Sequence, residues 1–187
     1  MRNALLLMLL VAAGCRTATT AHPGDALWDA LRPLCGKAFA GKLVEGTEPS
    51  DAEIGTQTLI MHVRQCGDSE MRIPFHVGEN RSRTWVLTRT ANGVRLKHDH
   101  RHEDGTEDRV TQYGGDTRST AGSRSLDFYA DDYTAKLLPA SATNIWTIAV
   151  DESGRTFTYA LRREAMGRRF RVDFDLTKPV ATPPKAW

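Results

Sequence analysis

The residues best suited to chemistry lie in the run Leu96 to His102 (LKHDHRH), where three histidines occupy alternate positions. In an extended strand alternate side chains point to the same face, so His98, His100 and His102 would share one face. Adjacent members would lie about 6.6–7 Å apart at Cα, which lets two imidazoles converge on one zinc ion. The outer two would be about 13 Å apart, so all three reach the same ion only if a bulge bends the strand.

Three interpretations of this histidine face stay open. The histidines would line a polar barrel mouth and hydrogen-bond to neighbouring groups and solvent, or His98 and His100 would form the polar part of a pocket wall and supply hydrogen-bond donors and acceptors. They would hold zinc or another divalent metal if a further ligand came from elsewhere, such as His62, His76, Glu103 or Asp104. The metal site is less favoured, because two histidines from one strand satisfy only half of a tetrahedral zinc shell. No other cofactor is indicated.

A hairpin is expected to position these histidines. Asn92-Gly93 separates two strand-like runs within residues 84–102 and predicts a type I′ turn, whose two central residues need positive φ. With that two-residue loop, Leu87 would lie opposite His98. The inward face would mix apolar and polar groups, and the side chains expected to bind a ligand on it are Trp85, Leu87, Arg89, His98 and His100.

Arginines are the second group of candidates. Arg81, Arg83 and Arg89 occupy odd-numbered positions of one run, and the expected register places Arg89 on the inward face. Burying an arginine is costly unless it is paired, so Arg89 either pairs with a carboxylate or belongs to an anion site near an open end. A further basic group is interpreted as a solvated hairpin tip or a contact with anionic lipid headgroups: Arg162, Arg163, Arg168, Arg169 and Arg171.

The apolar pattern indicates the elements that carry these side chains. Asp25 to Leu34 predicts an amphipathic helix, after which the period changes to two. Clear alternation predicts strands at 146–150, 157–161 and 170–176, with turns at residues 152–154 and 166–167. Weaker alternation predicts strands at 39–44, 56–66, 70–77 and 109–113, and residues 116–125 are expected to form a polar loop. Gly114-Gly115 is interpreted as an ordinary turn leading into that loop.

A short helix followed by many antiparallel strands predicts a mainly β fold. We expect one antiparallel β-barrel of about 8–10 strands, preceded by one short N-terminal helix, with a sandwich as the alternative. Consecutive hairpins favour the barrel, because closure removes exposed strand edges. The barrel domain would span residues 24–177, and residues 178–187 would form a C-terminal tail.

The first fifteen residues have the features of a signal peptide. Arg2 precedes the uncharged run ALLLMLLVAA, which is too short to span a bilayer core of about 30 Å. The run ends in Ala12-Ala13-Gly14-Cys15, which resembles the lipobox of bacterial lipoproteins. Ordinary signal-peptidase cleavage near Ala13, or further on near Ala18 to Ala21, is the alternative.

The lipobox resemblance implies where the protein lives. Cys15 would be acylated and become the mature N-terminus, residues 1–15 would be the signal peptide with its lipobox, and residues 16–23 would form a polar tether to the membrane. The residue after the cysteine is Arg16 and not an acidic residue, which resembles lipoproteins sent to the outer membrane. We therefore expect an exported protein, anchored by lipid in the bacterial envelope and facing the periplasm.

The odd number of cysteines fits this interpretation. If Cys15 carries the lipid, Cys35 and Cys66 are left as one pair in an oxidising compartment, where disulfides persist. Two free buried thiols are the alternative to a disulfide. A cysteine metal site is less favoured, because the sequence has no CxxC motif.

Part of the chain resembles a known fold family. The helix that contains Trp28, followed by Gly36 to Leu43 (GKAFAGKL), is similar to the entry into lipocalin-like (calycin) β-barrels. That resemblance implies a barrel of the same class. The chain also resembles exported proteins of Gram-negative bacteria, a likeness that implies no particular activity.

Three functions remain to be compared. The favoured one is non-enzymatic binding of a small, partly apolar ligand; the others are an assembly protein that binds another envelope protein, and a histidine-dependent metal-binding protein or enzyme. An enzyme is less favoured, because the sequence has no G-x-S-x-G, P-loop or H-E-x-x-H motif. A formal net charge of +2 gives no reason to expect nucleic acid.

Overall fold

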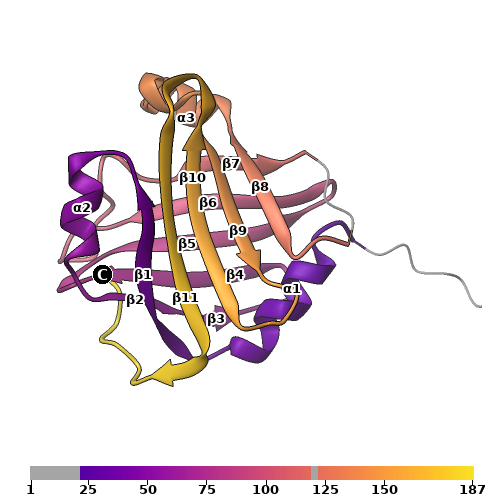
Figure 1. Cartoon of the computed structure of the whole chain (residues 1–187). Helices are drawn as coiled ribbons and strands as arrows, with labels where there is room; N and C mark the ends of the chain where they lie inside the picture. The colour runs from indigo at the N-terminus through magenta and orange to yellow at the C-terminus, as the bar shows by residue number, and fades with distance from the viewer. Residues whose placement is uncertain (1–21, 119–121) are drawn as a thin grey trace, which may run out of the picture.

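The chain folds into an antiparallel β-barrel, seen in a computed structural model that describes residues 22–118 and 122–187 (Figure 1). The expected signal peptide, Cys15 and most of the expected tether lie outside the described residues. The strands are β1 (Ala38–Gly46), β2 (Leu59–His62), β3 (Gln65–Cys66), β4 (Glu70–Val77), β5 (Asn80–Thr90), β6 (Gly93–His100), β7 (Tyr113–Thr117), β8 (Ser125–Ala130), β9 (Ile145–Val150), β10 (Thr156–Arg163) and β11 (Arg168–Val180).

Short helices interrupt the strands. They are α1 (Asp25–Leu31), η1 (Arg32–Leu34), α2 (Pro49–Gly55), α3 (Asp132–Leu137), η2 (Pro139–Ser141) and η3 (Glu164–Met166). Within the two described ranges, no helix has both the length and the apolar character needed to cross a membrane.

Ten strands close the barrel, and β3 is an extra strand at one edge. From β4 to β11 each strand pairs with the next one along the chain, and β1 then pairs with β11. The short strand β2 completes the ring, because it pairs with β1 on one side and with β4 on the other. The expected mainly β barrel of about 8–10 strands after a short helix is confirmed. It is compatible with a lipocalin-like fold.

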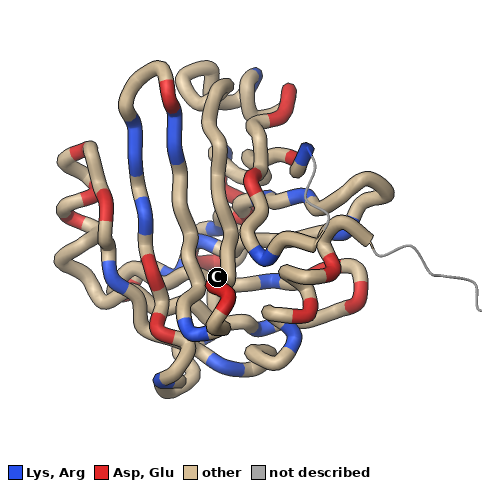
Figure 2. The backbone as a smooth tube through the Cα atoms, turned by 45° about the vertical axis from the view of Figure 1, so that its right-hand side comes forward, with Lys and Arg blue, Asp and Glu red and all other residues tan. Residues whose placement is uncertain are grey.

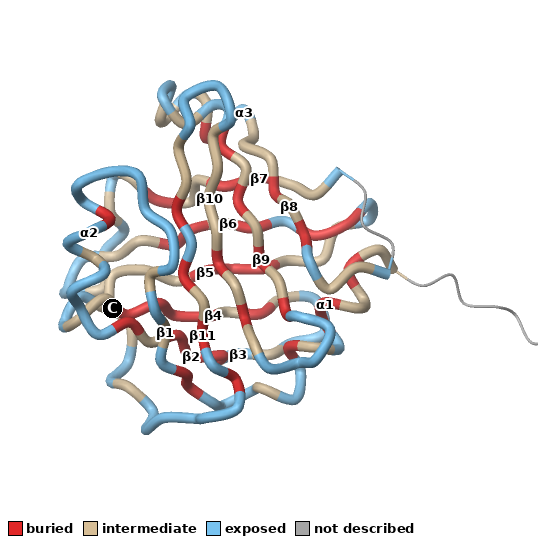
Figure 3. Tube along the Cα trace, in the orientation of Figure 1, coloured by how far each residue is buried: buried red, intermediate tan, exposed pale blue. Residues whose placement is uncertain are grey.

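Alternating side chains fill the interior. In β9, Trp146, Ile148 and Val150 are buried, and in β10 Phe157 and Tyr159 lie opposite them. Buried positions recur along the strands of both walls (Figure 3). The core is therefore a packed aromatic and aliphatic interior, as the period-two pattern predicted.

The N-terminal helix closes one end of the barrel. Leu27, Trp28 and Leu31 are fully buried, and the Trp28 indole Nε1 donates a hydrogen bond to the Gly67 carbonyl at 3.1 Å. The expected helix at residues 25–34 ends earlier, at Leu31, and continues as the 3₁₀ turn η1. Pro33 lies in that turn and has no N–H for an α-helical bond, which accounts for the change.

The central hairpin has a different turn from the one expected. Thr90 pairs with Gly93, so the loop is Ala91-Asn92, and His98 lies opposite Trp85 rather than Leu87. The shift is two residues, which leaves every side chain on its predicted face. Gly93 acts in close packing instead of in the turn, because a Cβ on it would lie 2.2 Å from the Thr117 hydroxyl oxygen of β7.

Several weaker expectations were wrong. Residues 109–112 are not a strand, and Gly114-Gly115 is part of β7 rather than a turn before a long loop. A Cβ on Gly115 would lie 1.6 Å from the Tyr129 carbonyl oxygen, so only glycine lets β7 approach β8 this closely. The helices α2 and α3 and the strand β8 were not predicted, since each is short and its apolar pattern is weak.

Cys35 and Cys66 form the expected disulfide. Their Cα atoms are 6.1 Å apart, and the bond closes a loop with a sequence separation of 31. It links the end of η1 to β3, so the helical plug is covalently attached to the edge of the barrel.

Reduction of this disulfide should destabilise the barrel. In the chain-entropy model a loop of this length contributes about 3–4 kcal/mol. We therefore expect urea unfolding in dithiothreitol to give a free energy of unfolding lower by about that amount. Dithiothreitol should have no effect on the double variant Cys35→Ala/Cys66→Ala, and an equal effect on both proteins would contradict this role.

Candidate functional site

A cavity of about 240 Å³ opens at the end of the barrel beside α2. Its walls come from α2, β4, β5, β6, β7, β10 and β11, and α2 lies away from α1 in the fold (Figure 1). Aromatic rings form much of the wall. Trp85 stacks on Phe75 with ring centroids 4.8 Å apart and on Tyr159 with centroids 4.4 Å apart. The barrel core therefore continues into the floor of the cavity.

A larger groove lies outside the barrel. It has a volume of about 660 Å³ and is lined by residues of β1, β10 and β11, including Val44, Arg155 and Lys178. None of the residues expected to bind a ligand lines it. The cavity beside α2 is therefore the better candidate site.

His98 lies in the wall of the cavity with both ring nitrogens engaged. Nδ1 lies 3.1 Å from the Tyr113 carbonyl oxygen, and Nε2 lies 2.8 Å from the Tyr159 hydroxyl. A carbonyl oxygen only accepts, so Nδ1 carries the proton and Nε2 accepts from the Tyr159 hydroxyl. The imidazole is therefore neutral and fixed in one tautomer, and neither nitrogen is free to bind a metal ion or a substrate.

Burial keeps both cavity histidines neutral. Loss of solvent lowers the pKa of His98 to about 3. The hydrogen bond to the Tyr113 carbonyl opposes this shift, and the nearby His100 adds to it, both with smaller effects. Burial also lowers the pKa of His100 to about 4, and the positive charge of Arg83 acts in the same direction. Within the described part of the chain, the hydrogen-bond partner of the His100 ring is a phenol, because its Nε2 lies 3.1 Å from the Tyr113 hydroxyl.

The structure does not bring the three histidines together. β6 ends at His100, and His102 is exposed in the loop that follows. Throughout residues 22–118 and 122–187, no three His, Cys, Asp or Glu side chains are grouped so that they could hold a metal ion. His62 and His76, considered as further ligands, are buried in β2 and β4 and do not line the cavity.

The five expected ligand-binding residues do not form one site, because they lie at the cavity, in the core and at the α1 end of the barrel. Trp85, His98 and His100 line the cavity, whereas Leu87 is fully buried in the core. Arg89 lies at the α1 end, where its guanidinium forms an ion pair with Asp25 and stacks 4.7 Å from the centroid of Trp28. Pairing with an acidic group is one of the two outcomes expected for Arg89.

Further residues complete the site. Arg83, one of the candidate arginines of the sequence, reaches the cavity from β5, where it precedes Trp85 by two and so shares its face. Three others were not indicated by the sequence: Tyr113 and Tyr159, which supply hydroxyl groups, and Asp51 of α2. α2 also had a usable signal: Pro49 at its first turn and Asp51 at the third helical position, whose carboxylate accepts the Glu48 N–H at 2.9 Å.

An ion pair attaches α2 to the barrel. The Arg168 guanidinium of β11 donates to both Asp51 carboxylate oxygens, with Nη2 to Oδ1 at 2.8 Å, and its Nε lies 3.1 Å from Glu48. Asp51 is 3% exposed and Arg168 12%. The bidentate geometry fixes α2 over the cavity, and the two buried charges neutralise each other.

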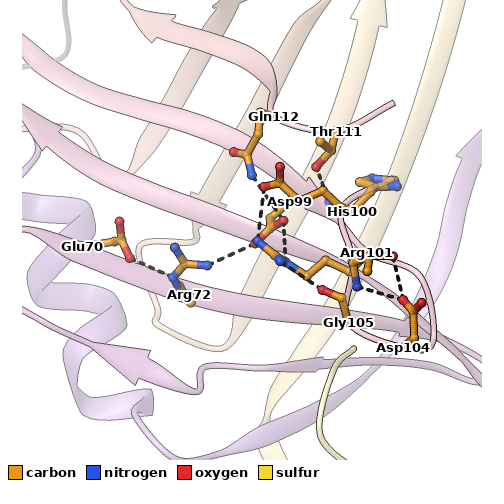
Figure 4. A network of polar contacts seen from close by, with 11 residues as sticks. Glu70, Arg72, Asp99, His100, Arg101, Asp104, Gly105, Thr111 and Gln112 are labelled. Atoms are coloured by element: carbon orange, nitrogen blue, oxygen red, sulfur yellow. Dashed lines mark hydrogen bonds and ion pairs between the residues drawn. The ribbon is translucent and has the colours of Figure 1, made fainter. Parts of the chain in front are cut away.

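A polar network holds β6 from outside the barrel. Asp99, between His98 and His100 in the sequence, accepts from Arg72 and Arg101, each at 3.2 Å, and from Gln112 (Figure 4). Its carboxylate is 6% exposed, so these partners are needed to compensate for its burial. The network anchors the strand that carries both histidines.

Four of the five basic residues near the turn between β10 and β11 form ion pairs within the fold, and Arg163 donates to the Asn144 side-chain oxygen at 2.8 Å. Arg162 pairs with Asp127, Arg169 with Glu164, and Arg171 with Asp173. Figure 2 shows the basic segments near the tip of this hairpin and acidic segments beside and below them. These contacts favour a hairpin held by ion pairs over a purely basic surface.

Acidification should weaken the fold through His98. Its pKa in the folded protein is about 3, below the ordinary value of 6.5, so the unfolded chain binds a proton first as the pH falls. Stability is then fully present above pH 6.5 and declines below it, by up to about 1.4 kcal/mol per pH unit for one histidine. Urea unfolding between pH 7 and 5 measures this slope.

The variant His98→Gln should show a shallower slope between pH 6.5 and 5 than the wild type. His102→Gln changes an exposed histidine and is the matched control, expected to follow the wild-type curve. If His98→Gln kept the full wild-type slope, the proposed role of the buried imidazole would be wrong.

Comparisons with known proteins give no family assignment. No protein-family model matches the chain, and no curated protein matches it either.

Proposed function

We propose that this protein is an exported, lipid-anchored envelope protein that binds a small, partly apolar ligand without catalysing a reaction. The observation that carries the proposal is the cavity of about 240 Å³ at the α2 end of a β-barrel. Binding sites for small molecules are concave and mostly apolar, with a few placed polar groups. This cavity has that composition, and it is smaller than the usual range of about 300–1,000 Å³.

The lining supports binding of an apolar group. Phe75, Trp85 and Phe170 present ring surfaces, and Ile54 of α2 and Leu161 of β10 add aliphatic contacts. The stacked rings of Phe75 and Trp85 are held by the core behind them, so the surface is formed before a ligand arrives. A preformed site lowers the entropy cost of binding.

The histidines are poorly suited to acid–base catalysis. A catalytic acid or base works best with a pKa near the operating pH, whereas burial lowers the pKa of His98 to about 3 and that of His100 to about 4. Among the residues the structure describes, no carboxylate forms a hydrogen bond with either ring. These facts favour a role in shaping the pocket.

The leader sequence supports export and anchoring. Its lipobox-like end places Cys15 where bacterial lipoproteins carry lipid, and residues 16–23 would connect the anchor to the barrel. The disulfide between Cys35 and Cys66 fits an oxidising compartment such as the periplasm. We therefore propose a location at the outer membrane, with the barrel in the periplasm and the membrane as partner through the lipid.

Filling the cavity should abolish ligand binding. Leu161→Trp adds an indole to the cavity wall, whereas Met166→Trp makes a similar change at a position that is 69% exposed. After incubation with extract of the bacterial envelope, native mass spectrometry should detect a bound small molecule on the wild type and on Met166→Trp. Leu161→Trp should retain less than a tenth of it.

Equal retention by both variants would place the ligand elsewhere, for example in the outer groove. A wild-type protein that carries no small molecule from any extract would argue against a binding function and favour the assembly protein. Circular dichroism checks that Leu161→Trp keeps the β-barrel.

Replacing the lipidation site should release the protein from the membrane. Cys15→Ser removes the thiol that the lipid would modify, so the variant should move from the membrane fraction to the soluble periplasmic fraction. Intact-mass measurement should show an added acyl mass on the wild type alone. A wild-type protein found soluble, and cleaved after residue 18 or beyond, would instead support ordinary signal-peptidase processing.

A further inference from the structure

Arg83 stands out among the arginines of the described chain. Its Nη1 is buried and has no hydrogen-bond partner there, and its guanidinium forms no ion pair with any described carboxylate. It lines the cavity, directly opposite His100 in the pairing of β5 with β6. A buried guanidinium nitrogen without an acceptor is costly, so its retention points to an acceptor that comes from outside the chain.

The other cationic group of the cavity is already neutralised. Arg168 is held by both oxygens of Asp51 and by Glu48, so its charge and its donors are in use. Asp108 influences His100 and Tyr113 electrostatically, but its carboxylate accepts the N–H of Val110 and forms no ion pair with Arg83. Arg83 is therefore the one cation facing the cavity whose charge the described protein does not balance.

The remaining polar groups of the cavity are neutral. Near neutral pH His98 and His100 carry no charge, because burial lowers the pKa of each. Burial raises the pKa of Tyr113 to about 12 and that of Tyr159 well above its usual value, so both phenols keep their protons. The Tyr113 hydroxyl lines the same cavity and lies 3.1 Å from His100 Nε2. With the His100 proton on Nε2, the ring donates to the Tyr113 oxygen, and the Tyr113 hydroxyl keeps its own proton for a ligand.

Charge balance then selects the class of ligand. The cavity presents one uncompensated positive charge, which one negative charge on a ligand would neutralise. A dianion such as a phosphate monoester would leave a second negative charge in a partly buried site. A carboxylate carries a single charge and matches the planar guanidinium with two acceptor oxygens.

We infer that the ligand is a small monocarboxylate, bound through its carboxylate by Arg83 and the Tyr113 hydroxyl, with its apolar part against Trp85 and Phe75. The inference deepens the proposed function and rests on it. The cavity volume of about 240 Å³ limits the apolar part to one ring or a short chain. The aromatic side chains in the wall, Phe75, Trp85 and Phe170, favour a flat group there.

The test compares matched acids and amides. Benzoate and hexanoate carry the carboxylate, benzamide and hexanamide replace it with a neutral group of the same shape, and phenyl phosphate supplies a dianion. Ligand-observed NMR titration against the wild-type protein should show at least one acid bound ten-fold or more tightly than its amide. Phenyl phosphate should bind more weakly than benzoate.

Variants of Arg83 test whether this arginine causes the preference for an acid over its amide. Arg83→Gln should remove the ten-fold preference for the acid, and Arg83→Lys should keep only part of it, because lysine retains the charge but not the planar fork. Arg155→Gln, at an exposed position in the outer groove, is the matched control. Arg83→Gln should melt at the same temperature as the wild type or higher, since it removes a buried donor without a partner.

The outcomes separate this inference from the proposed function. If acids and amides bind equally, or if Arg83→Gln keeps the preference, the carboxylate assignment is overturned while a binding cavity still stands. If no probe binds and the wild type carries no small molecule from any envelope extract, the proposed function fails and the inference falls with it. A large drop in melting temperature for Arg83→Gln would show that Arg83 has a structural partner.

Discussion

Closure of the barrel through β2 is the constraint on which the rest of the structure depends. This four-residue strand pairs with β1 on one side and with β4 on the other, so it joins the N-terminal strand to the long meander. In the closed barrel all inward side chains point into one shared interior, which alternate residues of the ten strands must fill. The aromatic residues do so, with Trp85 in contact with Phe75, Phe157, Tyr159 and Phe174.

The two ends of the closed barrel are covered in different ways. At one end α1 inserts Leu27, Trp28 and Leu31 into the core, and the disulfide attaches this plug to β3. At the other end α2 crosses without filling the interior, held by the ion pair between Asp51 and Arg168. The apolar side chains of α1 fill the first end and exclude a ligand from it. The ion pair holds α2 across the second end and leaves space for a ligand beneath this helix.

Sequence periodicity predicted the barrel because inward and outward residues alternate in most strands. It also placed Trp85, His98 and His100 on one face, and the two-residue error in the turn left that face unchanged. Periodicity could not indicate α2, whose seven residues bury chiefly one polar side chain, Asp51. Nor could it distinguish Arg83 from Arg89, since both share the parity of Trp85 and differ only in the barrel end at which they lie.

The contrast between these two arginines shows how position along a strand decides the role of an inward charge. Arg89 meets Asp25 and the ring of Trp28 at the plugged end, so the fold itself neutralises its charge and covers it. Arg83, six residues earlier in β5, faces neutral histidines and phenols beneath α2 and receives no acceptor there. The fold places a carboxylate beside each of four other arginines, so a carboxylate partner for Arg83 was also possible. These arginines are Arg72, Arg89, Arg162 and Arg168. Among the described residues, Arg83 has no ion pair, and it lies in a cavity whose wall includes Phe75, Trp85 and Phe170. A ligand accordingly explains it better than imperfect packing does.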